Sequence, residues 1–164
     1  MSPSIGVVIF PGSNCEQDAV ETIRGLGAEA HFLWHGSSEI GDIDGVIIPG
    51  GFAHGDYLRP GAIARFSPAM ESIVDFAKKG GPVIGICNGF QVLTEVGLLP
   101  GALQKNAGLK FLCKPVNLKV ESTNSVLTSQ AEKGVILRIP INHFEGNYTC
   151  SEKVLEDLRR NDRI

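Results

Sequence analysis

Short apolar runs alternate with stretches of helical periodicity along the first 100 residues of this chain. Four runs have the length and composition of buried strands: 5–10, 28–34, 44–51 and 82–86. Between them, apolar residues recur at helical spacing, with a possible capping box from Ser13 to Glu16 before the first helix and Ser67 before the second. This alternation predicts an α/β fold of the flavodoxin-like type, a doubly wound and mostly parallel sheet with helices on both faces.

The pattern changes after residue 100. The segments 110–120 and 134–141 have the composition of antiparallel or edge strands, and Pro115 and Pro140 limit their pairing. Ser151 is placed to cap a last helix. We therefore expect a small antiparallel addition to the parallel sheet, within a single domain that covers residues 1–164.

Composition excludes several classes of protein. The formal net charge is −3, so a nucleic acid gains no general attraction. No apolar run approaches the roughly 20 residues of a membrane span, and the first residues have no basic segment of a secretory signal. The four cysteines form no C-x-x-C pair, so no metal site is expected. Reduced thiols in a cytoplasm are the expected state.

The segment from Gly85 to Gly89 joins the fourth strand to a helix, with Cys87 at its centre. The spacing G-x-C-x-G is that of a nucleophile elbow. At such a corner the helix N-terminus faces the sulfur, which predicts a lowered thiol pKa. The Asn88 amide would then lie where an oxyanion develops. A buried cysteine in a glycine-rich turn is the alternative.

A second loop leaves the carboxyl end of a strand at Pro49-Gly50-Gly51. In doubly wound sheets ligands bind beyond those ends. The strand before this loop is expected beside the Cys87 strand, so a glycine amide here could be the second oxyanion donor. An ordinary strand-ending turn explains the same residues.

Both loops carry a family resemblance. The stretches GICNGFQVL and PGGFAHGDYLRPGAIA resemble the class I, triad-type glutamine amidotransferases. More narrowly, they resemble the glutaminase subunits of phosphoribosylformylglycinamidine synthase in de novo purine synthesis. VVIFPGSNCEQDA and PINHFEGNY fit the same subunits, so the resemblance runs from about residue 5 to the end.

The resemblance implies that Cys87 attacks the side-chain amide of L-glutamine, while the Gly51 and Asn88 amides hold the oxyanion. Phe52 and Gln91 would shape the glutamine pocket. Ammonia would pass to a large synthetase subunit that converts formylglycinamide ribonucleotide to the amidine, in a complex with a small third subunit. The chain has no G-x-x-x-x-G-K-[ST] phosphate loop, so no cofactor is expected here, and ATP and Mg²⁺ belong to the partner.

The general base is the open question. The family completes its triad with a His-Pro-Glu segment, and none of the four histidines here precedes a proline. The His143 segment matches another part of the family pattern, which the resemblance places near the glutamine pocket, and His54 is expected to be exposed or to face a partner. We therefore expect a chain truncated at its C-terminal side and inactive alone. The alternatives are a Cys-His hydrolase with His143 as base, and a glutaminase-like module that only binds the synthetase.

Overall fold

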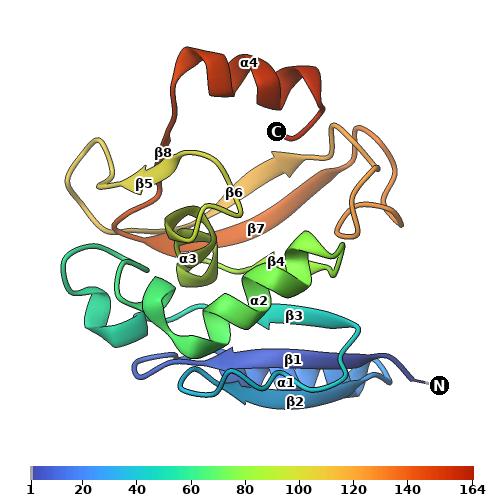
Figure 1. The fold of residues 1–164 in the computed structure, drawn as a ribbon. Helices are drawn as coiled ribbons and strands as arrows, with labels where there is room; N and C mark the ends of the chain where they lie inside the picture. The colour runs from blue at the N-terminus through green and yellow to red at the C-terminus, as the bar shows by residue number, and fades with distance from the viewer. Residues whose placement is uncertain (1) are drawn as a thin grey trace. The chain divides into compact units, whose positions relative to one another are not determined.

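A computed structural model describes residues 2–164 of the chain, which divide into two compact units, Met1–Leu99 and Pro100–Ile164. The first unit holds a sheet of four strands, three α-helices and two short 3-10 helices, η1 and η2 (Figure 1). The elements are β1 (Ser4–Ile9), α1 (Glu16–Gly25), β2 (Glu29–Trp34), β3 (Gly45–Ile48), η1 (Ala53–Asp56), η2 (Ala64–Phe66), α2 (Pro68–Lys78), β4 (Val83–Gly85) and α3 (Asn88–Glu95).

The four strands are parallel and lie in the order β2-β1-β3-β4. This is the order of a flavodoxin-like doubly wound sheet, in which the strand order reverses between β1 and β3. The register pairs Val7 with Ile47, and Ile48 with Gly85. The carboxyl ends of β1, β3 and β4 therefore open into neighbouring loops.

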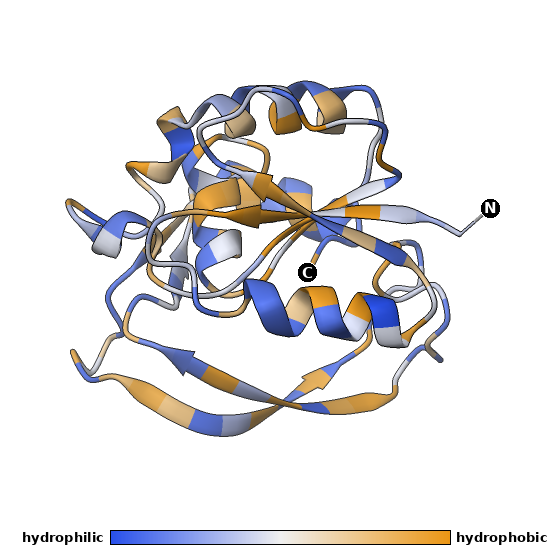
Figure 2. Cartoon of the chain, turned by 90° about the horizontal axis from the view of Figure 1, so that it is seen from below, coloured by the Kyte–Doolittle hydropathy of each residue, from blue (hydrophilic) through white to orange (hydrophobic). Residues whose placement is uncertain are grey.

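Successive residues of β1 point to opposite faces of the sheet, and each face has its own apolar core. Val7 packs with Val20 and Ile23 of α1. Val8 belongs to the cluster that holds residues of α2 and α3, among them Met70. Helices therefore cover both faces, which confirms the predicted fold class. In Figure 2 apolar colouring appears on strands of this sheet, and also on other elements of the chain.

The predicted capping box at the start of α1 is wrong. The Ser13 hydroxyl accepts a hydrogen bond from the Phe10 N–H at 3.0 Å, within the turn that leaves β1. Cys15 is the N-cap residue of α1 and makes no side-chain capping bond. Ser13 stabilises the turn after β1, and α1 begins only at Glu16, so the Ser13 hydroxyl does not cap the helix. At α2 the sequence signal holds, since Ser67 precedes Pro68 at the first helical position.

The second unit contains two antiparallel ribbons and a helix. The elements are β5 (Ala102–Gln104), β6 (Leu112–Lys119), β7 (Ile136–His143), β8 (Asn147–Thr149) and α4 (Glu152–Arg160). β5 pairs with β8, and β6 pairs with β7. Pro115 faces Pro140, so the two missing N–H donors share one rung of the ladder. The predicted antiparallel addition is present, and the Ser151 hydroxyl caps α4 by accepting from the Val154 N–H.

Residues 2–164 include no helix with both the length and the apolarity needed to cross a membrane.

Candidate active site

Cys87 occupies a strained corner between β4 and α3. Its backbone has φ 51° and ψ −107°, in a region that residues with a side chain rarely adopt. The two flanking glycines are required by close packing. A Cβ atom on Gly89 would lie 1.9 Å from the Ile48 carbonyl oxygen, and one on Gly85 would lie 2.6 Å from the Gly89 carbonyl carbon. The strand–turn–helix corner expected from the sequence is therefore present.

The thiol of Cys87 has a raised pKa, which overturns the lowered value that the sequence predicted. Burial is the largest cause, although the residue as a whole is exposed at the surface. A hydrogen bond from the Asn88 backbone N–H favours the thiolate but does not outweigh burial. The charges of Cys15 and Asp56 raise the pKa further.

Gly51 leaves the carboxyl end of β3 in a conformation that favours glycine. Its φ is 143°, and a Cβ atom there would lie 2.6 Å from the Asn14 nitrogen. The neighbouring amides are engaged: the Phe52 N–H donates to the Gly12 oxygen at 2.9 Å. The Gly51 N–H itself makes no hydrogen bond within the described residues 2–164.

The side chain of Asn88 joins the loop of residues 50–63 to α3. Its Oδ1 accepts a hydrogen bond from the Ala53 N–H at 3.0 Å. Its Nδ2 donates to Asp56 Oδ1 at 3.1 Å and to Gln91 Oε1 at 2.9 Å. Only 3% of Asn88 is exposed. We call this set of hydrogen bonds the Asn88 clasp. Ala53 and Asp56 lie 35 and 32 positions from Asn88, so sequence spacing does not indicate these two contacts.

The far end of the same loop is held to the far end of α3. Arg59 makes two short hydrogen bonds to the Glu95 carboxylate, at 2.6 and 2.7 Å. Between the two attachments, Gly61 lies against the helix backbone, since a Cβ atom there would be 2.9 Å from the Val92 Cα. The GDYLR-x-GA part of the family motif thus lays the loop along α3.

The three residues expected to shape the glutamine pocket lie in different surroundings. Phe52 is 52% exposed beside Gly51, whereas Gln91 is buried and accepts the hydrogen bond from Asn88. His143 belongs to the second unit, where its Nδ1 lies 3.0 Å from Oδ1 of the buried Asn106. Asn106 also donates to the His143 carbonyl oxygen at 3.0 Å, which fixes the backbone of that segment. Their roles toward glutamine stay predictions.

His54 is half-buried rather than exposed, and it packs against another histidine. The ring centroids of His35 and His54 are 5.1 Å apart, and each lies 5.9 Å from the ring of Phe10. His35 Nδ1 and His54 Nε2 are buried without a hydrogen-bond partner in the described chain. Burial, and then the neighbouring His54, lower the pKa of His35.

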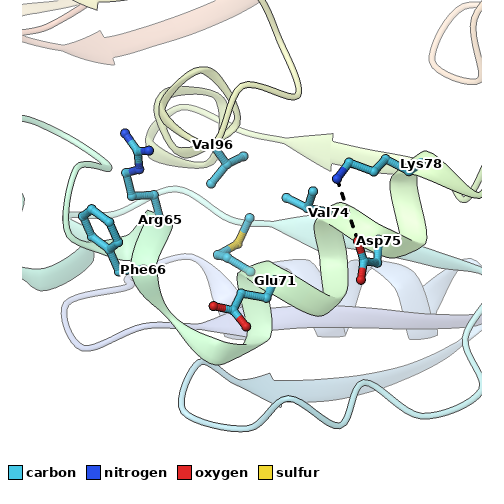
Figure 3. A pocket seen from close by; sticks show the side chains of 8 residues that line it. Arg65, Phe66, Glu71, Val74, Asp75, Lys78 and Val96 are labelled. Atoms are coloured by element: carbon cyan, nitrogen blue, oxygen red, sulfur yellow. Dashed lines mark ion pairs between the residues drawn. The ribbon is translucent and has the colours of Figure 1, made fainter.

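A separate groove of about 320 Å³ runs along α2 (Figure 3). Both charged side chains, such as Arg65 and Lys78, and apolar ones, such as Met70 and Val96, line it. The Lys78 ammonium lies 3.9 Å from Asp75 Oδ1, between two well-exposed side chains. The groove shares no residue with the Cys87 corner. Within residues 2–164, no three His, Cys, Asp or Glu side chains gather as metal ligands would.

With the fold and the corner in place, comparisons with known proteins identify the class. Residues 2–164 match the family model of the CobB/CobQ-like glutamine amidotransferase domain, and the chain belongs to that family.

Its relatives define a narrower group. The chain is 56% identical to phosphoribosylformylglycinamidine synthase subunit PurQ of Koribacter versatilis, over 97% of this chain and 69% of that protein. It is 50% identical to the PurQ subunit of Salinibacter ruber, over 100% of this chain and 70% of that protein. A chain of the solved PurLQS structure from Thermotoga maritima is 43% identical, with a TM-score of 0.88 over 93% of this chain and 71% of that chain. Within the amidotransferases, the chain therefore belongs with the PurQ subunits.

Proposed function

We propose that this chain is the glutaminase subunit of phosphoribosylformylglycinamidine synthase, with Cys87 as its nucleophile. The Cys87 sulfur attacks the side-chain carbonyl carbon of L-glutamine. The carbon–nitrogen bond breaks, ammonia leaves with a proton, and a thioester remains. Water then hydrolyses the thioester to glutamate and restores the thiol. The observation that supports this most is the strained Cys87 corner, held by two glycines that pack against backbone.

Two backbone amides stabilise the charge that develops on the carbonyl oxygen. The Asn88 N–H already points at the sulfur, and the Gly51 N–H makes no bond within the described chain. Fixed donors of this kind act at the transition state, and removal of one commonly slows a reaction by about 10²–10³-fold. Phe52 and Gln91, both of the first unit, recognise the rest of glutamine.

The ammonia serves a partner. The named relatives are subunits of a synthase, and one solved relative bears the name of a complex, PurLQS. A large synthetase subunit converts formylglycinamide ribonucleotide to the amidine with ATP and Mg²⁺, and a small third subunit completes the assembly. This chain has no phosphate-binding loop of the G-x-x-x-x-G-K-[ST] type, which fits the division of labour. The complex works in the cytoplasm.

None of the four histidines of the chain precedes a proline, so the family's His-Pro-Glu base segment has no match in residues 1–164. The Asn88 amide, Cys15 and Asp56 shift the pKa of the Cys87 thiol. His35 and His54 face one another instead. Positioned proton transfer contributes about 10²–10⁴-fold to such reactions. We therefore propose that the 164-residue chain by itself is acylated at Cys87 but has little turnover.

A chloroketone analogue of L-glutamine tests the proposal. We expect it to alkylate Cys87 selectively, L-glutamine to protect the thiol, and L-asparagine to protect it poorly. Mass mapping identifies the labelled residue, and Cys87→Ser is the control. Labelling without protection by L-glutamine would favour a module that only binds the synthetase. Turnover of glutamine that disappears in His143→Gln, with labelling kept, would favour a Cys-His hydrolase with His143 as base.

A further inference from the structure

The 50–63 loop is held in a conformation that it would not adopt by itself. Three of its residues with side chains, His54, Asp56 and Leu58, have positive φ values of 54°, 54° and 70°. Residues in this region persist only when surrounding contacts impose it. Near Gly51, the Asn88 clasp is a contact that reaches from α3 to this loop. The loop geometry at the Cys87 corner therefore depends on a side chain that is not itself a reacting group.

We propose that the side chain of Asn88 is a positioning residue, whose clasp on Ala53 and Asp56 sets the Gly51 amide against the Cys87 sulfur. This role rests on the proposed glutaminase function. The two oxyanion donors come from different elements, β3's loop and α3, and the Asn88 side chain ties one element to the other. The residue thus contributes a donor through its backbone and aligns the other donor through its side chain.

The chemistry of the clasp explains why an amide stands at this position. A buried group must accept a hydrogen bond from the Ala53 N–H and donate to the Asp56 carboxylate and to Gln91 at the same time. Asparagine has both an acceptor oxygen and a nitrogen with two donors. Aspartate at this position would place two carboxylates about 3 Å apart, which disfavours the charged pair. A buried polar group that loses its partners is destabilising in turn.

The loop also connects the clasp to the glutamine pocket. Gln91 accepts from Asn88, so the same amide that fixes the loop also orients a residue expected to contact the substrate. Released from the clasp, the loop would lose its bonds from Ala53 and Asp56 to α3, so the Gly51 amide would shift relative to the Asn88 amide. Misplacement of a reacting geometry by about 1 Å can slow a reaction by about 10²-fold.

The test compares two reagents on the full 164-residue chain. The chloroketone analogue of L-glutamine carries a carbonyl that occupies the oxyanion site, whereas iodoacetamide alkylates a thiol without needing that site. Both rates are measured across pH, so that a change in the Cys87 pKa is separated from the limiting rate. For Asn88→Asp we expect the limiting chloroketone rate to fall about 10–100-fold, with the limiting iodoacetamide rate within about 3-fold of the parent.

A reciprocal exchange provides the rescue. In the double variant Asn88→Asp with Asp56→Asn, the carboxylate at position 88 still accepts from Ala53 and now also accepts from the amide at position 56. Gln91 can rotate its amide to donate. We expect the double variant to recover the chloroketone rate to within about 3-fold, because both hydrogen bonds are restored and the like-charged pair is gone. Asn161→Asp is the matched control, since the Asn161 Nδ2 also donates to an aspartate, Asp157, but on an exposed helix.

Asn88→Ser replaces Asn88→Asp if the charged variant does not fold. The short serine hydroxyl cannot reproduce the clasp, so we expect the same fall in the limiting chloroketone rate with a nearly unchanged iodoacetamide rate. The inference is overturned if Asn88→Asp or Asn88→Ser slows both reagents equally or neither, or if the double variant stays as slow as Asn88→Asp. Those results would leave the proposed function standing. A parent chain that the chloroketone does not label at Cys87, or that L-glutamine does not protect, would overturn the proposed function and this role with it.

Discussion

Replacement of Gly89 by alanine should disrupt the Cys87 corner more than any single methyl group elsewhere in α3. The added Cβ would lie 1.9 Å from the Ile48 carbonyl oxygen and 2.7 Å from its carbon. Ordinary contacts begin at 3.4 Å, so the overlap is about 1.5 Å and its partner is strand backbone, which cannot rotate away. Either α3 or β3 must move by about that distance.

The magnitude follows from the packing on both sides. Val92 and Leu93 of α3 are buried in the same core as Ile48, so a shift of the helix strains that core. Overpacking of this kind lowers the free energy of unfolding by about 1–3 kcal/mol, and more where backbone is the obstacle. A helix displaced by about 1 Å also carries the Asn88 amide away from the reacting atoms, so chloroketone labelling should slow by about 10²-fold.

Gly25→Ala is the matched control, because Gly25 is the last residue of α1 and no heavy atom lies within 4 Å of its added Cβ. There, alanine should raise the free energy of unfolding by up to about 1 kcal/mol through helix propensity. Urea unfolding gives both stabilities, and mass mapping gives the labelling rate. A Gly89→Ala chain as stable and as quickly labelled as the Gly25→Ala chain would refute the steric reasoning.

Three further outcomes are expected. Iodoacetamide alkylation of Cys87 should rise at higher pH in the folded chain than in the urea-unfolded chain, because burial raises the pKa of the folded Cys87 thiol. Coincident pH profiles of Cys87 labelling, measured by mass mapping, would contradict this. The pKa of His35 is lowered from 6.5 in the folded chain, so the unfolded chain takes up a proton first as pH falls below about 6.5. The free energy of unfolding, measured in urea, should therefore fall from pH 7 to pH 5, and it should fall less in His35→Phe. An equal fall in both chains would exclude His35 as a cause. Arg59→Ala should lower the free energy of unfolding by about 1–3 kcal/mol, because it leaves the Glu95 carboxylate, whose side chain is only 12% exposed, without its partner. Glu95→Gln should lower the free energy of unfolding less. The reverse order in urea unfolding would count against the pairing.

Local spacing was sufficient to predict the corner and the strands before it. Gly85 and Gly89 flank Cys87 within five consecutive residues, so the turn can be predicted from the local sequence alone. The apolar runs likewise predicted β1 to β4 and the doubly wound topology, because buried parallel strands need nearly continuous apolar sequence. The three-residue strands β5 and β8 were missed, since they are too short to show a period.

Contacts between distant residues could not be predicted in the same way. Asn88 meets Ala53 and Asp56 across 35 and 32 positions, and Arg59 meets Glu95 across 36. A family motif indicated that these positions matter but not which atoms meet. The predicted direction of the Cys87 pKa shift was wrong for a related reason. The helix N-terminus can be placed from sequence, whereas the burial of the thiol depends on all the residues that pack around it.

The attachment of the 50–63 loop at both ends of α3 has a consequence for the local unfolding of the protein. The Ala53 amide hydrogen is bonded to a buried side chain of the helix, so its exchange with solvent deuterium requires the clasp to open. Loop and helix should then exchange as one cooperative segment, rather than the loop fluctuating above a static helix. An opening of the loop at Ala53 would then be accompanied by a loss of protection in α3, which deuterium exchange of the two segments can measure.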